Sequence, residues 1–412
     1  MSIKKSLFAG VSILAVSGLF AAGGSIADKP SGFRFFNQKL TIKPYLSLSY
    51  TYDSNIDTSK HAEDDNIFMV SPGVDFEWKG DRWSLAGGVW YRYSAYCDYS
   101  DQMGEDSYGQ SLKYAWTTSE QNEKGWSLML AERYAFISQS DGLNSNMGRG
   151  IWRDREAVNV SGALQRRFTE RWHASLSGQY DWLNYKNETG NYAPLYGWSQ
   201  YSGGLEFGYA ASAWTDILVA GGYSSYKHNQ STGYHHYSND SDSWTVQAGL
   251  GTHATKNITY RVLMGASWLS YGGQNNVDSG WTYSLSSNWR LHRQWQWSMS
   301  GQSYYQPSDR TLGQAMKVYA LSTGVSYLTL ADKLRLAFDV AFRYEETAYN
   351  DDLVAWGMDY DETIVSARLS ANYTLNRWVS LFANIIWEDN SSDNMYWEYD
   401  RVRGTLGVRF HY

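Results

Sequence analysis

Arginine recurs in this sequence on segments in which apolar and polar residues alternate, and there it occupies polar positions. Its planar guanidinium group stays charged, and its N–H donors fit a carboxylate, sulfate or phosphate group. Fewer carboxylates share these positions, so the polar side of the segments is basic. The arginines are Arg92, Arg133, Arg155, Arg261, Arg335, Arg343, Arg368, Arg401 and Arg403, and the carboxylates are Asp75, Glu77, Asp181, Glu206 and Asp339.

Two roles are open for these arginines. They attract anionic solutes, or they pair with the carboxylates and the backbone and so hold a wide polar interior open. The choice depends on which side chains meet in space, and a single sequence does not show this. Trp90 and Tyr304 fall on the same polar side, where they either stack on sugar rings or belong to an aromatic girdle.

A second group of chemically capable residues is the set His228, His235, His236, Asp240 and Asp242. Such a set could bind a divalent ion or serve a hydrolase. A solvated loop rich in Tyr, His, Asn and Ser explains the same residues. The sequence contains no Gly-flanked nucleophile motif, no His-Glu-x-x-His and no phosphate loop. We therefore expect no enzyme, no metal site and no cofactor.

The positions of all these residues depend on β-strands. Val402, Val408, Phe410 and Tyr412 alternate with polar residues, and a period of two gives a strand one apolar and one polar face. The pattern recurs from about Thr41 onward, with long and short connections in alternation. The predicted strands are 43–54, 66–78, 83–97, 106–118, 126–138, 153–168, 172–185, 199–210, 215–227, 243–255, 258–271, 280–290, 294–305, 316–328, 334–344, 362–374, 378–388 and 397–412.

These strands predict a barrel in a membrane. Beyond the N-terminal segment, no stretch approaches the roughly 20 consecutive apolar residues that a spanning helix needs. In lipid, only helices and closed barrels satisfy their own backbone polar groups. We therefore expect an all-β fold, a transmembrane antiparallel up-and-down β-barrel of about 18 strands with 16 as the alternative, and both termini in the periplasm.

Short connections carry a basic residue shortly before an aromatic that opens the next strand. Trp belongs at a membrane–water boundary, where its ring is apolar and its N–H stays wet. A composition of 34 Tyr, 20 Trp and 5 Pro suits many strands with aromatic girdles. The long connections are acidic, as at 345–361 and 388–400, and mark the opposite face. The predicted girdle consists of Trp83, Trp126, Trp172, Trp295, Trp378, Phe410 and Tyr412.

The N-terminal segment has the pattern of a secretory signal peptide. Lys4 and Lys5 precede an apolar run from Leu7 to Ala22, and small residues lead to Asp28. We expect a cleaved signal peptide at 1–27, a short periplasmic segment at 28–42 and the barrel at 43–412. Cys97 is the single cysteine, which excludes a disulfide framework and a paired-Cys metal site.

Glu132 breaks the alternation. It falls on the face that Leu128, Leu130 and Tyr134 share. Either a β-bulge turns Glu132 toward the polar side or the register changes there. We prefer the bulge.

Residues 43–56 and 70–74 resemble the opening of the outer-membrane β-barrel porin family (β-barrel porin 2). Members of that family tend to show a Pro, Tyr-rich strands and Asp-x-Asn at the first loop, then a strand with Ser-Pro-Gly. In this chain these features are Pro44, Asp53 to Asn55, and Ser71 to Gly73. The resemblance implies an outer-membrane barrel, often linked to surface polysaccharide systems, with no enzymatic residues to carry over.

From these observations we expect a Gram-negative outer-membrane channel for passive passage of small hydrophilic or anionic solutes, including saccharides, with a link to polysaccharide export. Its partners would be outer-membrane lipid and lipopolysaccharide, the barrel-insertion machinery through the C-terminal strand, and the solute. A formal net charge of −7 argues against nucleic acid. A rim-loop hydrolase and a structural or adhesive barrel with a closed lumen remain alternatives.

Overall fold

The computed structural model describes residues 32–37, 39–56, 62–98, 104–118, 124–141, 151–185, 197–228, 240–252, 257–271, 277–307, 315–329, 333–348, 361–393 and 398–412. The predicted signal peptide at 1–27 lies outside these ranges. Within them, no helix is long and apolar enough to cross a membrane.

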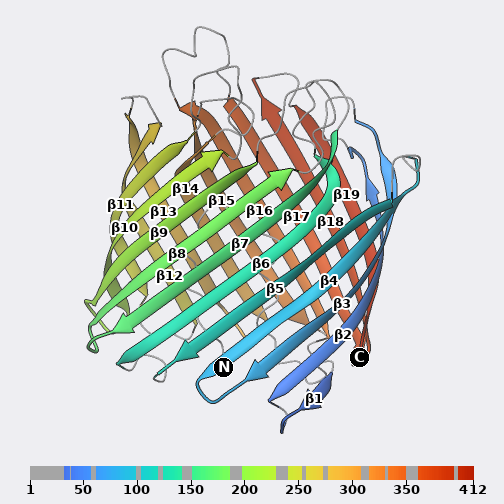
Figure 1. Cartoon of the computed structure of the whole chain (residues 1–412), viewed down its shortest axis with the longest axis horizontal. Coiled ribbons are helices and arrows are strands. Elements are labelled where there is room, and N and C mark those ends of the chain that lie inside the picture. The colour runs from blue at the N-terminus through green and yellow to red at the C-terminus, as the bar shows by residue number, and fades with distance from the viewer. Residues whose placement is uncertain are drawn as a thin grey trace.

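Antiparallel strands, inclined to a common axis, form the wall of a barrel (Figure 1). They are β1 (Phe33–Phe35), β2 (Leu40–Asp53), β3 (Asp65–Lys79), β4 (Trp83–Tyr96), β5 (Gly104–Thr117), β6 (Gly125–Asp141), β7 (Ile151–Arg167), β8 (Trp172–Tyr185), β9 (Trp198–Ala210), β10 (Thr215–His228), β11 (Ser241–Thr252), β12 (Ile258–Tyr271), β13 (Val277–Arg290), β14 (Trp295–Pro307), β15 (Ala315–Thr329), β16 (Leu334–Ala348), β17 (Asp361–Asn376), β18 (Val379–Ser392) and β19 (Tyr399–His411).

The barrel closes where β19 pairs with β2. Each strand from β2 to β18 pairs with the next one in sequence, so the ring is an up-and-down barrel of eighteen strands. This confirms the predicted antiparallel barrel of eighteen strands, and most predicted strand bounds lie within a few residues of the observed ones. β1 stands apart from the ring, because it pairs only with the start of β2, from Phe33 opposite Ile42 to Phe35 opposite Leu40.

The two ends of the barrel differ in their connections. The short-turn rim carries the connections 80–82, 168–171, 211–214, 291–294 and 377–378, and the long-connection rim lies opposite. The wall both starts and ends at the short-turn rim. There the Tyr412 N–H donates to the Pro44 carbonyl at 3.1 Å, near the first residues of β2.

Side-chain oxygens close several of the short turns. Asn376 Oδ1 accepts the N–H of Trp378 at 2.8 Å and that of Val379 at 3.0 Å. Ser212 Oγ accepts the N–H groups of Trp214 and Thr215 in the same way. Asn and Ser favour turns because their short side chains can replace a backbone acceptor. These contacts set the point at which the next strand begins.

The wall is discontinuous between β13 and β14. Their ladder runs only from Ser284 opposite Gln302 to Arg290 opposite Gln296, although β13 pairs with β12 up to Val277. Beyond Ser284, side chains replace the ladder. Thr282 Oγ1 donates to the Ser303 carbonyl at 2.6 Å, and the Tyr283 N–H donates to Ser303 Oγ at 3.0 Å.

Next to this break, β14 and β15 are displaced toward the barrel interior at their ends near the long-connection rim, so that they lie on the inner side of β12. The register puts Lys317 on the same outer side as Leu321. Yet Lys317 Nζ lies 3.0 Å from Ser267 Oγ, on the inner side of β12, and Lys317 is only 4% exposed. The Lys317 ammonium also lies 3.9 Å from the centre of the Tyr305 ring. The wall therefore steps inward at β14–β15 near the long-connection rim.

Candidate functional site

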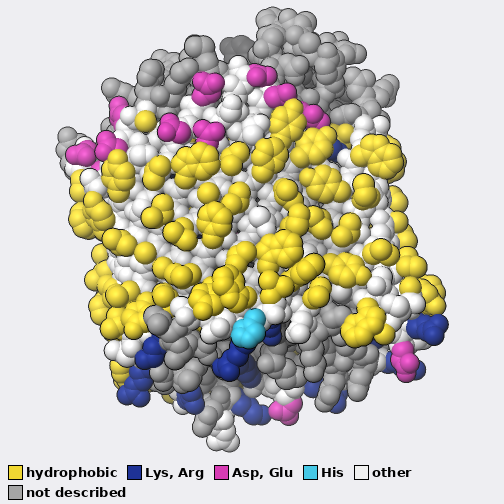
Figure 2. All heavy atoms as spheres, turned by 180° about the vertical axis from the view of Figure 1, so that it is seen from behind, with side chains coloured by type: hydrophobic (Ala, Val, Ile, Leu, Met, Phe, Trp, Pro, Cys, Tyr) yellow, Lys and Arg dark blue, Asp and Glu magenta, His cyan; other side chains and the backbone are white. Residues whose placement is uncertain are grey.

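Register divides the wall into two faces, because directly opposed residues of neighbouring strands point to the same side. One face carries large apolar side chains that are strongly exposed, such as Leu46, Tyr50 and Phe68, which is 53% exposed. Figure 2 shows such side chains as a broad band across the wall. An apolar surface that continues around a barrel suits contact with lipid and not with water.

The opposite face is the inside of the barrel. On it, Arg261 of β12 reaches Glu206 of β9, with Nε at 3.0 Å and Nη2 at 2.8 Å from Glu206 Oε2. Strands β10 and β11 lie between the two residues. Side chains converge over such a distance only on the concave side of a curved sheet. The polar face is therefore internal, and the chain is a membrane-spanning barrel of the outer-membrane type.

The register places the whole predicted polar set on this inner face; whether these residues touch a solute stays a prediction. The arginines lie on β4 (Arg92), β6 (Arg133), β7 (Arg155), β12 (Arg261), β16 (Arg335 and Arg343), β17 (Arg368) and β19 (Arg401 and Arg403), and the carboxylates on β3 (Asp75 and Glu77), β8 (Asp181), β9 (Glu206) and β16 (Asp339).

Some members of the set are paired, as the structural role predicts. Arg401 binds Asp53 through two hydrogen bonds, with Nε at 2.8 Å from Oδ1. Arg343 pairs with Glu345 on its own strand. Asp181 is bound by amides instead, because Asn159 Nδ2 lies 2.5 Å away. Asp53 and Glu345 were absent from the predicted set, although both lie at polar positions of their strands.

Other members are not paired within the described residues. Arg92 lies exposed inside the barrel, with its guanidinium 5.5 Å from the centre of the Trp90 ring. Arg133 is exposed as well. Arg368 Nε is buried and has no hydrogen-bond partner. The structure therefore divides the predicted arginines into paired ones and ones that retain free donors.

Small apolar clusters also lie on the inner face. Leu218 and Leu263 pack together, and Leu263 is fully buried. Met316 and Val318 pack with Tyr304 at the inward step of the wall. Tyr304 is therefore engaged in packing, which disfavours the prediction that it stacks on a sugar. The period of two could not reveal these clusters, because it assigns a residue to a face and not to its neighbours.

Aromatic residues gather toward the short-turn rim. Trp83 contacts Trp78 edge-on with ring centres 5.4 Å apart, and Trp378 contacts Tyr412 at 5.5 Å. The Arg377 guanidinium lies 4.5 Å from the Trp378 ring centre. The other predicted girdle residues, Trp126, Trp172, Trp295 and Phe410, are also exposed, and Figure 2 shows Lys and Arg mostly along this end of the barrel.

At the long-connection rim, outward tyrosines bind carboxylates of the next strand. Tyr223 donates to Asp242 at 2.7 Å and Tyr344 to Asp361 at 2.9 Å. In Figure 2 acidic side chains gather along this end, beyond the apolar band. The acidity of this end was predicted from the connections. The tyrosine contacts were not, because they depend on the register between strands.

The prediction of a bulge at Glu132 is wrong. The ladders of β6 with β5 and β7 run through Glu132 without interruption, opposite Leu112 and Val160. Glu132 therefore stays on the outer face. It accepts a hydrogen bond from Gln110 Nε2 at 3.2 Å. Gln110 is the outward residue of β5 next to Leu112, and this hydrogen bond accommodates the outward carboxylate without a bulge.

The predicted histidine group is described only in part. His235 and His236 lie outside the described residues, as does the His228 side chain. Asp242 is the acceptor of Tyr223 on the outer face. Within the described ranges, no group of three or more His, Cys, Asp or Glu residues could hold a metal ion.

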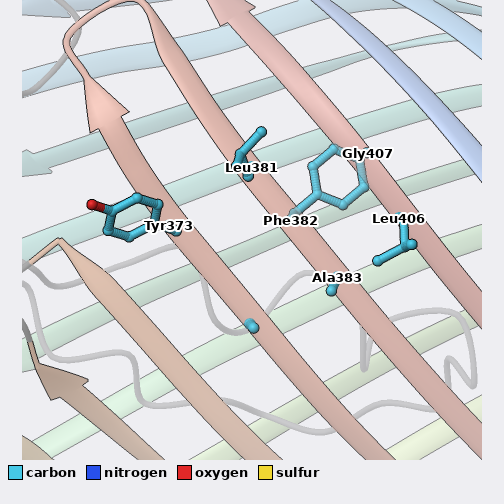
Figure 3. A pocket seen from close by; sticks show the side chains of 7 residues that line it. Tyr373, Leu381, Phe382, Ala383, Leu406 and Gly407 are labelled. Carbon is cyan, nitrogen blue, oxygen red and sulfur yellow. The ribbon is translucent and has the colours of Figure 1, made fainter.

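A shallow depression of about 310 Å³ lies over β17, β18 and β19, and Figure 3 shows its lining. Leu381 and Leu406 belong to the exposed apolar face. On the inner side, the Phe382 ring lies against Gly407, where an added Cβ would come within 2.2 Å of Phe382 Cζ. The depression therefore belongs to the lipid-facing surface and not to the polar interior.

Comparison with known proteins finds similarity of fold. No family model and no curated relative matches the sequence. Among solved structures, the chain is similar to OccAB4 of Acinetobacter baumannii, with 10% identity, 90% of this chain and 98% of that chain covered, and a TM-score of 0.43. It is similar to the outer membrane channel DcaP of the same organism, with 12% identity, coverage of 93% and 100%, and a TM-score of 0.41. It is also similar to the siderophore receptor PirA from Pseudomonas aeruginosa, with 7% identity, coverage of 90% and 80%, and a TM-score of 0.43.

Proposed function

We propose that this chain is a passive channel of the bacterial outer membrane for small hydrophilic solutes, with a preference for anions. The observation that carries the proposal is the ring of eighteen strands with a polar inner face. Barrels of about 16–18 strands are wide enough to leave an aqueous passage. Exposed cationic side chains inside the wall, such as Arg92 and Arg133, would raise the local concentration of anions.

The preferred orientation has the short-turn rim, and with it both ends of the wall, in the periplasm. Basic and aromatic side chains at that rim, such as Arg377 over Trp378, suit contact with phospholipid headgroups. The acidic rim would then face outward, toward lipopolysaccharide. Insertion of the barrel would use β19, whose aromatic end resembles the signal read by the insertion machinery.

The resemblance of residues 43–56 and 70–74 to β-barrel porin 2 extends the proposal to anionic saccharides and a role beside surface polysaccharide export. Trp90 supports this extension, because its ring lies on the inner face beside Arg92. An aromatic ring next to a guanidinium can stack on a sugar while the cation binds a carboxylate.

Conductance across a planar lipid bilayer tests the proposal. The refolded full chain should give discrete channel events, and a salt gradient should give a reversal potential on the anion-selective side. Heat-denatured protein is the control. Absence of events from folded, inserted protein would contradict the channel, and cation selectivity would contradict the anion preference alone.

One observation favours a second candidate, a structural barrel with a closed lumen. The inward step of β14 and β15 brings Lys317 against Ser267 and narrows the interior near the long-connection rim. Long connections that fold inward would also close the lumen, and two of them, 139–152 and 345–361, lie largely outside the described residues. The same bilayer measurement separates the two candidates, because a closed barrel would insert without conducting.

A further inference from the structure

A row of inner-face residues crosses the wall from β16 to β2. Asp339 lies directly opposite Arg368, which lies opposite Ile386, followed by Arg403 and then Asp53. Because opposed residues share a face, all of them point into the barrel. Two cations therefore flank an isoleucine, with one carboxylate beyond each of them.

The two carboxylates are directed away from the cations between them. Asp53 is bound by Arg401, with Nε at 2.8 Å from Oδ1 and a second hydrogen bond from Nη2. Asp339 leans over Gly324 of β15, where an added Cβ would lie 2.1 Å from Asp339 Oδ1. The absence of a side chain at Gly324 lets this carboxylate turn toward β15. Neither carboxylate thus neutralises its neighbour in the row by direct contact.

Within the described residues, the two guanidinium groups consequently keep free donors. Arg368 Nε is buried and has no hydrogen-bond partner among these residues. In the described part of the chain, Arg403 makes no hydrogen bond or ion pair, although it interacts electrostatically with Arg368, Arg401, Asp53 and Glu388. Partial burial without a partner is unfavourable for a cation, and a ligand that supplies acceptors would remove that cost.

The spacing of the two arginines suits one small anion. Two strand steps separate their backbones, which is roughly 10 Å. Two long side chains that approach from both sides of Ile386 can place their N–H forks around a single oxyanion. Asn384, the next inner residue of β18, has a buried Oδ1 without a hydrogen-bond partner in the described part of the chain. Its amide can turn to present N–H groups to the same point.

We propose that Arg368 and Arg403 form a binding site for an oxyanion, the carboxylate, sulfate or phosphate group of a solute. The site deepens the proposed function, since it rests on that function for the route by which the solute arrives. Glu388, held by the Tyr399 hydroxyl at 2.6 Å, lies in electrostatic range of Arg403 and keeps the affinity moderate. A moderate affinity is what a channel needs, because a bound solute must also leave.

Isothermal titration of the refolded full chain in detergent micelles tests the site without reference to conduction. The probes are sodium sulfate and sodium glucuronate, with glucose as the uncharged control. We expect saturable binding of at least one anion and none of glucose. Binding of both indicates recognition of any oxyanion. Binding of glucuronate alone indicates a planar carboxylate on a sugar, and sulfate alone indicates a tetrahedral group.

The variants are Arg368→Gln and Arg403→Gln, each compared with Arg290→Gln, which removes the same charge from the inner face at the short-turn end of β13. We expect each of the first two to weaken anion binding about tenfold or more, and Arg290→Gln to change it less than about twofold. Arg403→Lys should bind the anion more tightly than Arg403→Gln but less tightly than the natural chain. The lysine ammonium keeps the charge, but it lacks the planar pair of N–H donors of a guanidinium group. A shift of mobility on unheated gels verifies that each variant is folded.

Equal loss in all variants, or no loss in Arg368→Gln and Arg403→Gln, would overturn the site and leave the channel intact. Conversely, anion binding by a barrel that does not conduct would contradict the proposed function and leave the site standing. In the bilayer, sulfate should reduce chloride current in a saturable manner through the natural chain and through Arg290→Gln, but not through the two site variants.

Discussion

Arg401 and Asp53, 348 residues apart in sequence, are joined by two hydrogen bonds across the seam that closes the barrel. Asp53 is almost completely buried, at 1% exposed, and lies at the end of β2. Beside this pair, Thr51 Oγ1 and Thr405 Oγ1 lie 2.9 Å apart, and Asn55 Nδ2 donates to the Asp400 carbonyl at 3.0 Å. The seam between first and last strands of the ring is thus held by side chains as well as by its ladder.

Removal of one partner of this pair should destabilise the barrel. Arg401→Gln leaves the Asp53 carboxylate buried without its cation, and we expect the free energy of unfolding to fall by about 3 kcal/mol. Urea titration in detergent, followed by tryptophan fluorescence, measures the change. The control is Glu77→Gln, whose pair with Lys79 is largely exposed and should cost less than about 1 kcal/mol. Equal losses of unfolding free energy in both variants would show that the seam pair stabilises the barrel no more than an exposed pair does.

The outward carboxylate at Glu132 should cost stability in lipid. Glu132→Leu removes a polar group from the lipid-facing side, and we expect a gain of about 1 kcal/mol in vesicles. The neighbouring variant Leu130→Glu, on the same face, should lose a similar amount. Unfolding titrations in phospholipid vesicles measure both. A loss of stability in Glu132→Leu would show instead that Glu132 faces another polar surface in the membrane.

The break between β13 and β14 should appear in hydrogen exchange. Backbone N–H groups of 277–283 and 303–307 that face the break lack ladder partners, so we expect them to exchange faster than those of 341–348. The latter segment lies at the same rim, and β16 pairs with β15 as far as Ala348. Peptide-resolved mass spectrometry makes the comparison. Equal protection of the segments would contradict a weak junction in the wall.

Charge reversal at Arg133 should alter ion selectivity without altering the fold. Arg133 is exposed on the inner face, so Arg133→Glu replaces an attraction for anions by a repulsion. We expect the reversal potential in a salt gradient to shift toward cation selectivity, with a larger shift at low ionic strength. Lys79→Glu, at the end of β3, is the matched charge reversal near the rim. An unchanged reversal potential in Arg133→Glu would show that ions do not pass this residue.

The period of two was sufficient to predict the strands and the two faces. Apolar and polar residues alternate along most of the wall, and a polar residue on the lipid side is costly, so Arg92, Arg261 and Arg403 could be assigned to the interior from sequence. At Glu132 the period of two gave the observed outer face, and the expected bulge was wrong. There a single hydrogen bond with Gln110 stabilises an outward carboxylate, and the contact depends on a neighbouring strand that alternation does not position.

By itself, the sequence determined that this chain has strands with one apolar and one polar face, in a number that closes a barrel. Only the tertiary structure decided which charges meet. Arg401 and Arg403 both lie on the polar face of β19. Arg401 is bound to Asp53, whereas the donors of Arg403 are free within the described residues. The physical reason is that charge pairing depends on register and closure, which bring together residues from strands far apart in the chain.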